Sequence, residues 1–134
     1  MNSDTPLVLI THTLPEEWLL KLEGRCRILT GPPEATELNS ELEERLPEAQ
    51  GLLTLLTIPV SERLLDQAPT LKVVSNMAVG YDNVDVEACT RRGIPVGNTP
   101  GVLTEGTADL SMALLLAAAR RLPEASRDAR EGRW

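Results

Sequence analysis

The stretch VVSNMAVGYDN, residues 73–83, decides the fold, because an apolar, β-branched run typical of a buried strand ends in a glycine followed by helix-capping residues. A strand that leads directly into a helix is the repeating unit of a parallel sheet. We therefore expect Gly80 to lie at the carboxyl end of this strand. The helix that follows, over residues 84–92, is expected to be capped by Asp82 or Asn83.

Strand-like and helix-like segments alternate outward from this stretch. Strands are predicted at residues 7–12, 26–30, 51–57, 71–77 and 94–98. Helices are predicted from Pro15 to Gly24, along the apolar stripe Leu38, Leu42, Leu46 and Ala49, after a Ser61 cap, and over 84–92 with Gly93 just past its end. Parallel strands joined by helices are covered on both faces. The pattern predicts an α/β fold with a flavodoxin-like, doubly wound, parallel five-stranded sheet.

The pattern changes after the fifth strand, where a loop leads into a helix that is apolar almost all the way round. We expect this helix over residues 107–121, and because a surface helix shows only one apolar stripe, we expect it to contact another domain or another subunit. Its longest apolar run has eight residues, MALLLAAA, and a membrane span needs about 20. No membrane association is predicted.

The composition excludes several functional classes. The 134 residues suit one ordinary domain, and 42% apolar residues provide a core with only 2% aromatic side chains. A net charge of −7 repels nucleic acid and anionic lipid. Cys26 and Cys89 lack metal or redox spacing and are expected to be reduced, and the first residues do not resemble a signal peptide. These features predict a cytoplasmic protein without nucleic-acid partners.

The first candidate site follows from the position of Val79 and Gly80, since ligands of open α/β sheets bind beyond the carboxyl ends of the strands. Without a Cβ at Gly80 the backbone can approach a ligand, and the N–H groups of Val79 and Gly80 can bind a small carboxylate. The alternative is that Gly80 only makes a tight turn. Leu56, near the end of another strand, is either a core residue or one wall of a small pocket.

A second candidate site lies at the start of the apolar helix. Thr104 is a natural N-cap, which places Gly106 and Thr107 in the first turn, where free N–H groups and a hydroxyl can meet a polar ligand group. The alternative is a simple capped helix. His12, the only histidine, is expected to face the crevice, but no acidic partner is indicated and we do not assign it a catalytic function. No metal cluster or dinucleotide fingerprint is recognisable.

A family resemblance rests on the run NMAVGYDNVDVEACTRRGIPVGNTPGVLTEGTADLSMALLLAAARRLPEA, residues 76–125, with GLLTLLT upstream and EGRW downstream. The run resembles the D-isomer-specific 2-hydroxyacid dehydrogenases, and among them the glyoxylate/hydroxypyruvate reductases. The resemblance implies that residues 1–98 are the first part of the substrate-binding domain. Residues 99–134 are then the crossover loop and the helix that begins the Rossmann NAD(P)-binding domain and helps to form a homodimer.

The same resemblance implies functions for four residues. The Val79 and Gly80 amides hold the carboxylate of the 2-oxo acid, Leu56 lines its pocket, and Thr107 contacts the nicotinamide end of NAD or NADP. In the family, the dinucleotide fingerprint and the catalytic arginine, glutamate and histidine come later in the chain than the segment that resembles residues 76–134. We therefore assign no catalytic residue to this chain and expect it to be inactive alone.

The implied activity of the parent protein is NAD(P)H-dependent reduction of glyoxylate or hydroxypyruvate to the D-hydroxy acid. An alternative is a non-catalytic module of the same fold that senses a 2-oxo acid or a nucleotide. A flavodoxin or a receiver domain is disfavoured. The segment THTLPEE has no glycine for a phosphate loop, and Thr11, His12 and Thr57 stand where a receiver needs acidic residues.

Overall fold

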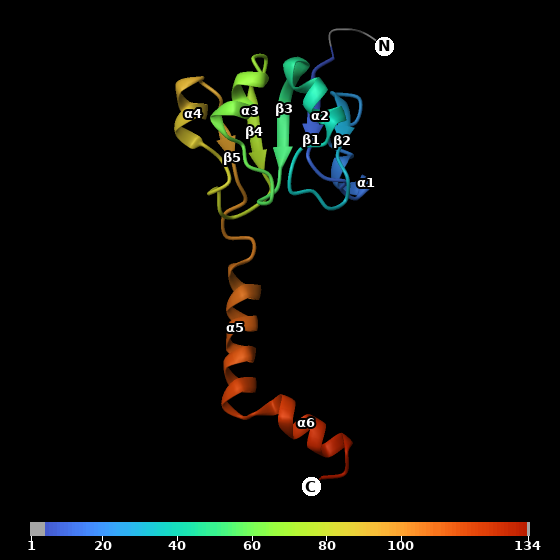
Figure 1. Cartoon of the computed structure of the whole chain (residues 1–134), viewed down its shortest axis with the longest axis vertical. Coiled ribbons are helices and arrows are strands. Elements are labelled where there is room, and N and C mark those ends of the chain that lie inside the picture. The colour runs from blue at the N-terminus through green and yellow to red at the C-terminus, as the bar shows by residue number, and fades with distance from the viewer. Residues whose placement is uncertain (1–4, 134) are drawn as a thin grey trace. The chain divides into compact units, whose positions relative to one another are not determined.

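The computed structural model describes residues 5–133 (Figure 1). These residues form two compact units whose boundary lies between Pro100 and Gly101. The first unit contains the sheet, and the second contains two helices.

The first unit is built on one five-stranded sheet in which all four neighbouring pairs are parallel. The strands are β1 (Leu7–Ile10), β2 (Arg27–Thr30), β3 (Ala49–Thr54), β4 (Val73–Asn76) and β5 (Val96–Gly97). Their spatial order is β2-β1-β3-β4-β5, which is the flavodoxin-like order (Figure 1). The predicted fold class is confirmed. The carboxyl ends of β1, β3, β4 and β5 lie along one edge of this sheet, which we call the carboxyl edge.

Four short helices connect the strands: α1 (Glu16–Leu19), α2 (Ser40–Arg45), α3 (Glu62–Gln67) and α4 (Val86–Arg91). The prediction of a helix from Pro15 to Gly24 is wrong in length, because α1 has four residues and buries none of them, so no packing stabilises further turns. The helix predicted along the stripe from Leu38 to Ala49 is also shorter than expected. Pro47 cannot donate a backbone hydrogen bond, α2 gives way to the 3-10 turn Leu46–Glu48, and Ala49 already begins β3.

The core fills one face of the sheet. Leu9, Leu52 and Val74 are neighbours in the register and pack against side chains of α2, α3 and α4 such as Leu42, Leu65 and Cys89. The opposite face carries Val8, Leu53 and Val73, and the Val73 side of it is open, with 43% of that residue exposed. Ile10, on the same face as Val8, is fully buried, so the expectation that both faces are covered holds at β1 and fails at Val73. Three of the four connecting helices contribute to the first face, and α1 has no buried residue.

The start of α4 differs from the prediction. Asp85 caps it, with Oδ1 accepting a hydrogen bond from the Ala88 amide at 2.8 Å, and neither Asp82 nor Asn83 is the cap. Asn83 cannot begin the helix because its carbonyl accepts from the Val60 amide at 2.7 Å in a short parallel bridge. The Ser61 cap of α3 is confirmed, with 3.4 Å between Oγ and the Leu64 amide.

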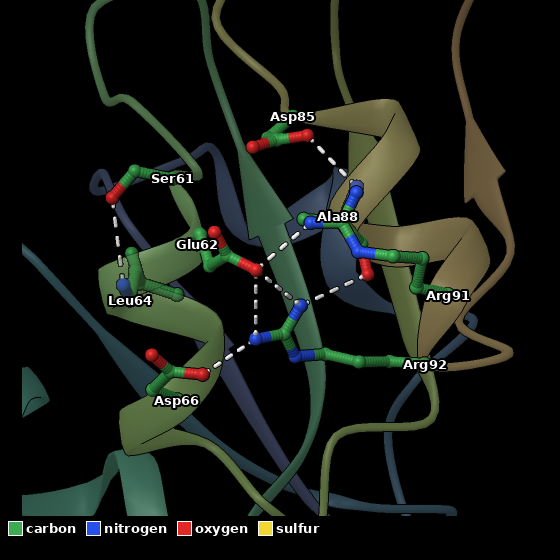
Figure 2. Close-up of polar contacts among 8 residues, drawn as sticks. All are labelled: Ser61, Glu62, Leu64, Asp66, Asp85, Ala88, Arg91 and Arg92. Carbon is green, nitrogen blue, oxygen red and sulfur yellow. Dashed lines mark hydrogen bonds and ion pairs between the residues drawn. The ribbon is translucent and has the colours of Figure 1, made fainter.

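Helices α3 and α4 are joined by a charged cluster on their outer surfaces (Figure 2). Arg91 contacts Glu62 at 2.8 Å, while Arg92 contacts both Glu62 and Asp66 and also donates to the Ala88 carbonyl. The hydrogen bond to Asp66 raises the pKa of Arg92 above its ordinary value. We call these four charged residues the α3–α4 clamp.

The second unit consists of α5 (Thr104–Ala119) and α6 (Leu122–Arg130). Leu103 occupies the N-cap position of α5 without a side-chain hydrogen bond, so the prediction that Thr104 is the cap is wrong. The helix ends before the predicted residue 121, because Arg121 adopts the left-handed conformation with φ of 51° and separates it from α6. Among the described helices, none is long and apolar enough to cross a membrane.

Candidate carboxylate-binding site

The turn that follows β4 is held by three hydrogen bonds to its carbonyl groups. The Ala78 carbonyl accepts from the Thr99 amide, the Val79 carbonyl from Asn98 Nδ2 and the Gly80 carbonyl from Asn76 Nδ2, each at 2.8 Å. Residues from β4 and from the segment after β5 thus fix three consecutive peptide groups. The sequence predicted the place of this turn at the carboxyl edge but not the residues that hold it.

The amides of Val79 and Gly80 are the free groups of this turn. Neither N–H has an acceptor among residues 5–133. In a trans peptide the N–H points opposite to the preceding carbonyl, so binding of the Ala78 and Val79 carbonyls directs these two amides away from Thr99 and Asn98. Val79 is 41% exposed and Gly80 is half-buried. Two adjacent donors are therefore oriented and accessible to an acceptor from outside the chain.

Nothing within the described chain requires a glycine at position 80. Its φ lies outside the left-handed region, and a Cβ built on it would have only Asp82 Oδ2 within 4 Å, at an ordinary 3.5 Å. The turn itself would accept alanine. The alternative explanation, that Gly80 only permits a tight turn, is therefore not supported by this geometry, and the space above Gly80 is available to a ligand.

Leu56 lies in the loop after β3, because that strand ends at Thr54 rather than at residue 57. The residue is 57% exposed, so the alternative of a core leucine is wrong. The carbonyls on either side of it, those of Leu55 and Ile58, both accept from Asn83 Nδ2 at 3.1 Å. The structure thus links the Leu56 loop to the turn that carries Gly80.

Asn76 and Asn83 belong to this site although they were not predicted there from the sequence. Asn76 is fully buried at the end of β4 and Asn83 is half-buried, and their side chains are hydrogen-bonded to each other. One signal was available, since an asparagine within an apolar strand must find partners for its amide when it is buried.

His12 does not face an open crevice, as the sequence had suggested, but is 5% exposed. Its Nδ1 lies 2.8 Å from Thr11 Oγ1, and its Nε2 lies 3.2 Å from the Ala35 carbonyl and 3.1 Å from Thr57 Oγ1. A carbonyl can only accept, so Nε2 carries a proton. The ring joins three loops of the carboxyl edge. The described residues also contain no group of three or more metal-ligating side chains.

Thr107 belongs to the second unit, so the structure does not combine it with the other three predicted residues. Its amide donates to the Leu103 carbonyl at 2.9 Å, and its carbonyl accepts from Ser111 Oγ. The expectation of a free amide is therefore wrong, because Thr107 is already within the helix ladder. Its exposed hydroxyl has no hydrogen-bond partner among the described residues.

The sequence of this chain matches a known protein family. Residues 8–131 match the model for the D-isomer specific 2-hydroxyacid dehydrogenase, catalytic domain. The chain belongs to this family. The recognition made from residues 76–125 is thereby confirmed, and the family is one of oxidoreductases.

Relatives of this chain include several proteins named glyoxylate reductase. The glyoxylate reductase of Korarchaeum cryptofilum (strain OPF8) is 46% identical over 129 residues, which are 96% of this chain and 39% of that protein. The glyoxylate reductase of Aeropyrum pernix is 59% identical over 87 residues, or 65% of this chain and 26% of that protein. The chain thus spans 39% of the length of the first of these relatives.

Several solved structures have the same fold as this chain. The TT0316 protein of Thermus thermophilus has a TM-score of 0.82 and 43% identity, covering 96% of this chain and 41% of that one. The NADPH-dependent glyoxylate/hydroxypyruvate reductase of Sinorhizobium meliloti, solved with NADP and malonate, has a TM-score of 0.73 and 32% identity, covering 98% and 40%. A D-lactate dehydrogenase from Aquifex aeolicus agrees in fold, with a TM-score of 0.80 at 22% identity over 95% of this chain and 38% of that one.

Proposed function

We propose that the first unit binds the carboxylate of a small 2-oxo acid at the Val79 and Gly80 amides, with Leu56 as an apolar wall. The whole protein would then reduce glyoxylate or hydroxypyruvate to the D-hydroxy acid. The observation that carries the proposal is the pair of oriented amides without an acceptor in the described chain. The names of the relatives and the malonate bound to one of them support a small organic acid as the ligand.

Two backbone donors suit a carboxylate for a physical reason. A carboxylate has two oxygens that accept hydrogen bonds, and a hydrogen bond to a charged group contributes about 1.5–3 kcal/mol, more than one between neutral groups. The overall charge of −7 opposes anion binding at long range. Short-range, fixed donors at Val79 and Gly80 therefore have to supply the affinity, and a small ligand can reach both of them.

The proposed cofactor is NAD or NADP, and it would supply the hydride when bound. The residue of this chain that we assign to it is Thr107, at its nicotinamide end. An exposed hydroxyl without a partner in the described residues fits a polar group of that kind. A Thr107→Val variant of the full-length protein should bind NAD(P)H roughly fivefold more weakly, the effect of about one neutral hydrogen bond of 1 kcal/mol. An unaltered titration would remove Thr107 from the site.

We further propose that the 134 residues alone do not reduce glyoxylate. Carbonyl reduction needs an acid that protonates the developing alkoxide. His12, the only histidine, is buried and has partners at both ring nitrogens, so its ring is not available at the candidate site. Mixing the chain with NADPH and glyoxylate should leave the NADPH absorbance constant, and steady oxidation would contradict this assignment.

A homodimer is the proposed assembly, formed through α5, the helix that was expected over residues 107–121. The support is that α5 has no buried residue although it carries large apolar side chains, among them Leu110, Leu114 and Leu115, each about 60% exposed. An apolar surface of this kind marks an interaction site.

The substitution Gly80→Ala tests the carboxylate site most sharply. The fold has room for this Cβ, whose one neighbour within 4 Å is Asp82 Oδ2, so thermal stability should change little. The added methyl group is expected to hinder a carboxylate that approaches the two amides. We expect glyoxylate affinity, measured by calorimetry, to fall about tenfold or more, which is the effect of losing at least one charged hydrogen bond. Gly97→Ala is the matched control, because Gly97 also has an unrestricted φ and open space around its Cβ. Equal affinities in both variants would refute the site.

A further inference from the structure

Two asparagines connect the loop that carries Leu56 to the turn that carries Val79 and Gly80. Asn76 is the last residue of β4 and is fully buried, and Asn83 is half-buried in the segment before α4. Neither side chain carries charge or faces the ligand space directly, yet every polar atom of both is used in hydrogen bonds. Such an arrangement fixes the groups around it.

Asn83 is hydrogen-bonded to the loop that carries Leu56. Its Nδ2 lies 3.1 Å from both the Leu55 and the Ile58 carbonyls and shares its two hydrogens among these two oxygens and Asn76 Oδ1, while its own main-chain carbonyl accepts from the Val60 amide at 2.7 Å. One residue therefore contacts the loop at three points along residues 55–60. Leu56 lies between the first two of these points and projects into solvent with 57% of its surface exposed.

Asn76 is hydrogen-bonded to the turn that carries the Val79 and Gly80 amides. Its Nδ2 donates to the Gly80 carbonyl at 2.8 Å and to Asn83 Oδ1 at 3.1 Å, and its Oδ1 accepts from Asn83 Nδ2 at 3.2 Å. A continuous chain of hydrogen bonds thus runs from the Gly80 carbonyl through Asn76 and Asn83 to the Leu55 and Ile58 carbonyls. The Gly80 carbonyl belongs to the turn whose two amides are free.

We infer that Asn76 and Asn83 are positioning residues, which we call the asparagine pair, and that they set the distance between Leu56 and the Val79–Gly80 amides. The inference rests on the proposed function, since it assigns a purpose to that distance. A fixed separation limits the size of the acid that can touch both walls. His12 holds the same loop from its other side, through the 3.1 Å contact between Nε2 and Thr57 Oγ1.

The loop can lose its position without loss of the fold. The Leu55 carbonyl lies beside the exposed Leu56, so water can replace the Asn83 donor there, while Ile58 is only 1% exposed and its side chain still anchors the end of the loop. The main-chain bridge between Val60 and Asn83 does not depend on the side chain. Removal of the amide should therefore disturb the placement of Leu56 more than the stability of the sheet.

The test compares Asn83→Leu with Asn39→Leu in the 134-residue chain. Asn39 is also half-buried, and its side chain also makes a backbone hydrogen bond, but it caps α2 by accepting from the Leu42 amide at 3.0 Å and touches neither wall. Both variants should lose some stability. Only Asn83→Leu should weaken glyoxylate binding, by about tenfold. Equal glyoxylate affinities of the two variants would overturn the positioning function.

A measurement without ligand separates this inference from the proposed function. Backbone ¹⁵N relaxation should show increased mobility of residues 55–58 and of Val79 and Gly80 in Asn83→Leu, and no change there in Asn39→Leu. Unchanged mobility of both segments overturns the inference whatever glyoxylate does. Absence of glyoxylate binding to the wild-type chain would overturn the proposed function, and relaxation would still decide the positioning. If Asn83→Leu does not fold, Asn83→Ala takes its place in the same measurements.

Discussion

The two units of this chain use apolar residues in opposite ways. In the first unit, Leu9, Leu42 and Val74 are fully buried between the sheet and its helices. In the second unit, α5 is at least as apolar, yet none of its residues is buried. The comparison teaches that apolar content alone does not make a core, because burial needs a second surface. The first unit contains that surface, whereas α5 buries no residue against any other described part of the chain.

A core substitution should separate the two units most strongly. Leu9→Ala removes a fully buried side chain from the middle of the sheet and should lower the free energy of unfolding by about 2–5 kcal/mol. Leu115→Ala is the control, since Leu115 is 61% exposed, and it should change this free energy by no more than about 0.5 kcal/mol. Urea unfolding followed by circular dichroism measures both. Similar losses in the two variants would remove the distinction between the units.

A charge placed on α5 should have the next largest effect. Sedimentation of the wild-type chain should show self-association through α5, and Leu115→Lys should weaken it about tenfold, because burying a leucine contributes about 1.5–3 kcal/mol. Lys21, exposed on the first unit, supplies the control Lys21→Leu, which adds an apolar side chain elsewhere and should leave the Leu115-dependent association unchanged. A wild-type chain that sediments only as a monomer would contradict the proposed homodimer.

The α3–α4 clamp should contribute less than the core. Arg92→Ala removes contacts to Glu62, Asp66 and the Ala88 carbonyl and should cause a small loss of thermal stability that shrinks as salt is added, because the ion pairs are at the surface. Arg25→Ala is the control, as Arg25 is exposed and has no ion pair within the described residues. A salt-independent loss would show that Arg92 acts by packing instead.

The smallest effect concerns Cys89 and appears only in alkaline solution. Burial, and then the Asp85 carboxylate, raise the pKa of the Cys89 thiol, while Arg92 opposes them. Because the folded chain holds this proton more tightly than the unfolded chain, the contribution is complete below the unfolded pKa and is lost as pH rises through the folded value. Melting temperatures of Cys89→Ala should therefore decline less between neutral and alkaline pH than those of the wild type. Parallel declines would contradict the assignment.

The sheet was predictable because each strand and its following helix carry local signals. The run before Gly80 predicted β4, and the Ser61 cap predicted α3, since both depend on a few adjacent residues. Helix ends were less predictable. The start of α4 depends on a bridge between Val60 and Val84, two residues far apart in the sequence, and no local pattern reveals that bridge.

The candidate site was predictable in its position but not in its construction. Parallel topology alone places Val79, Gly80 and Leu56 at the carboxyl edge, so the sequence sufficed for the position of these residues, while their binding function stays a prediction. The asparagine pair and the burial of His12 arise from side chains that meet across four loops. Some of these hydrogen bonds join residues that are far apart in the sequence, so composition and spacing do not reveal them.

The most direct test of the central claim is an NMR titration of the ¹⁵N-labelled chain with glyoxylate. The account predicts that the amide resonances of Val79 and Gly80 move first and furthest, with smaller changes in residues 55–58. Saturable binding that leaves these two amides in place and moves resonances elsewhere would contradict it.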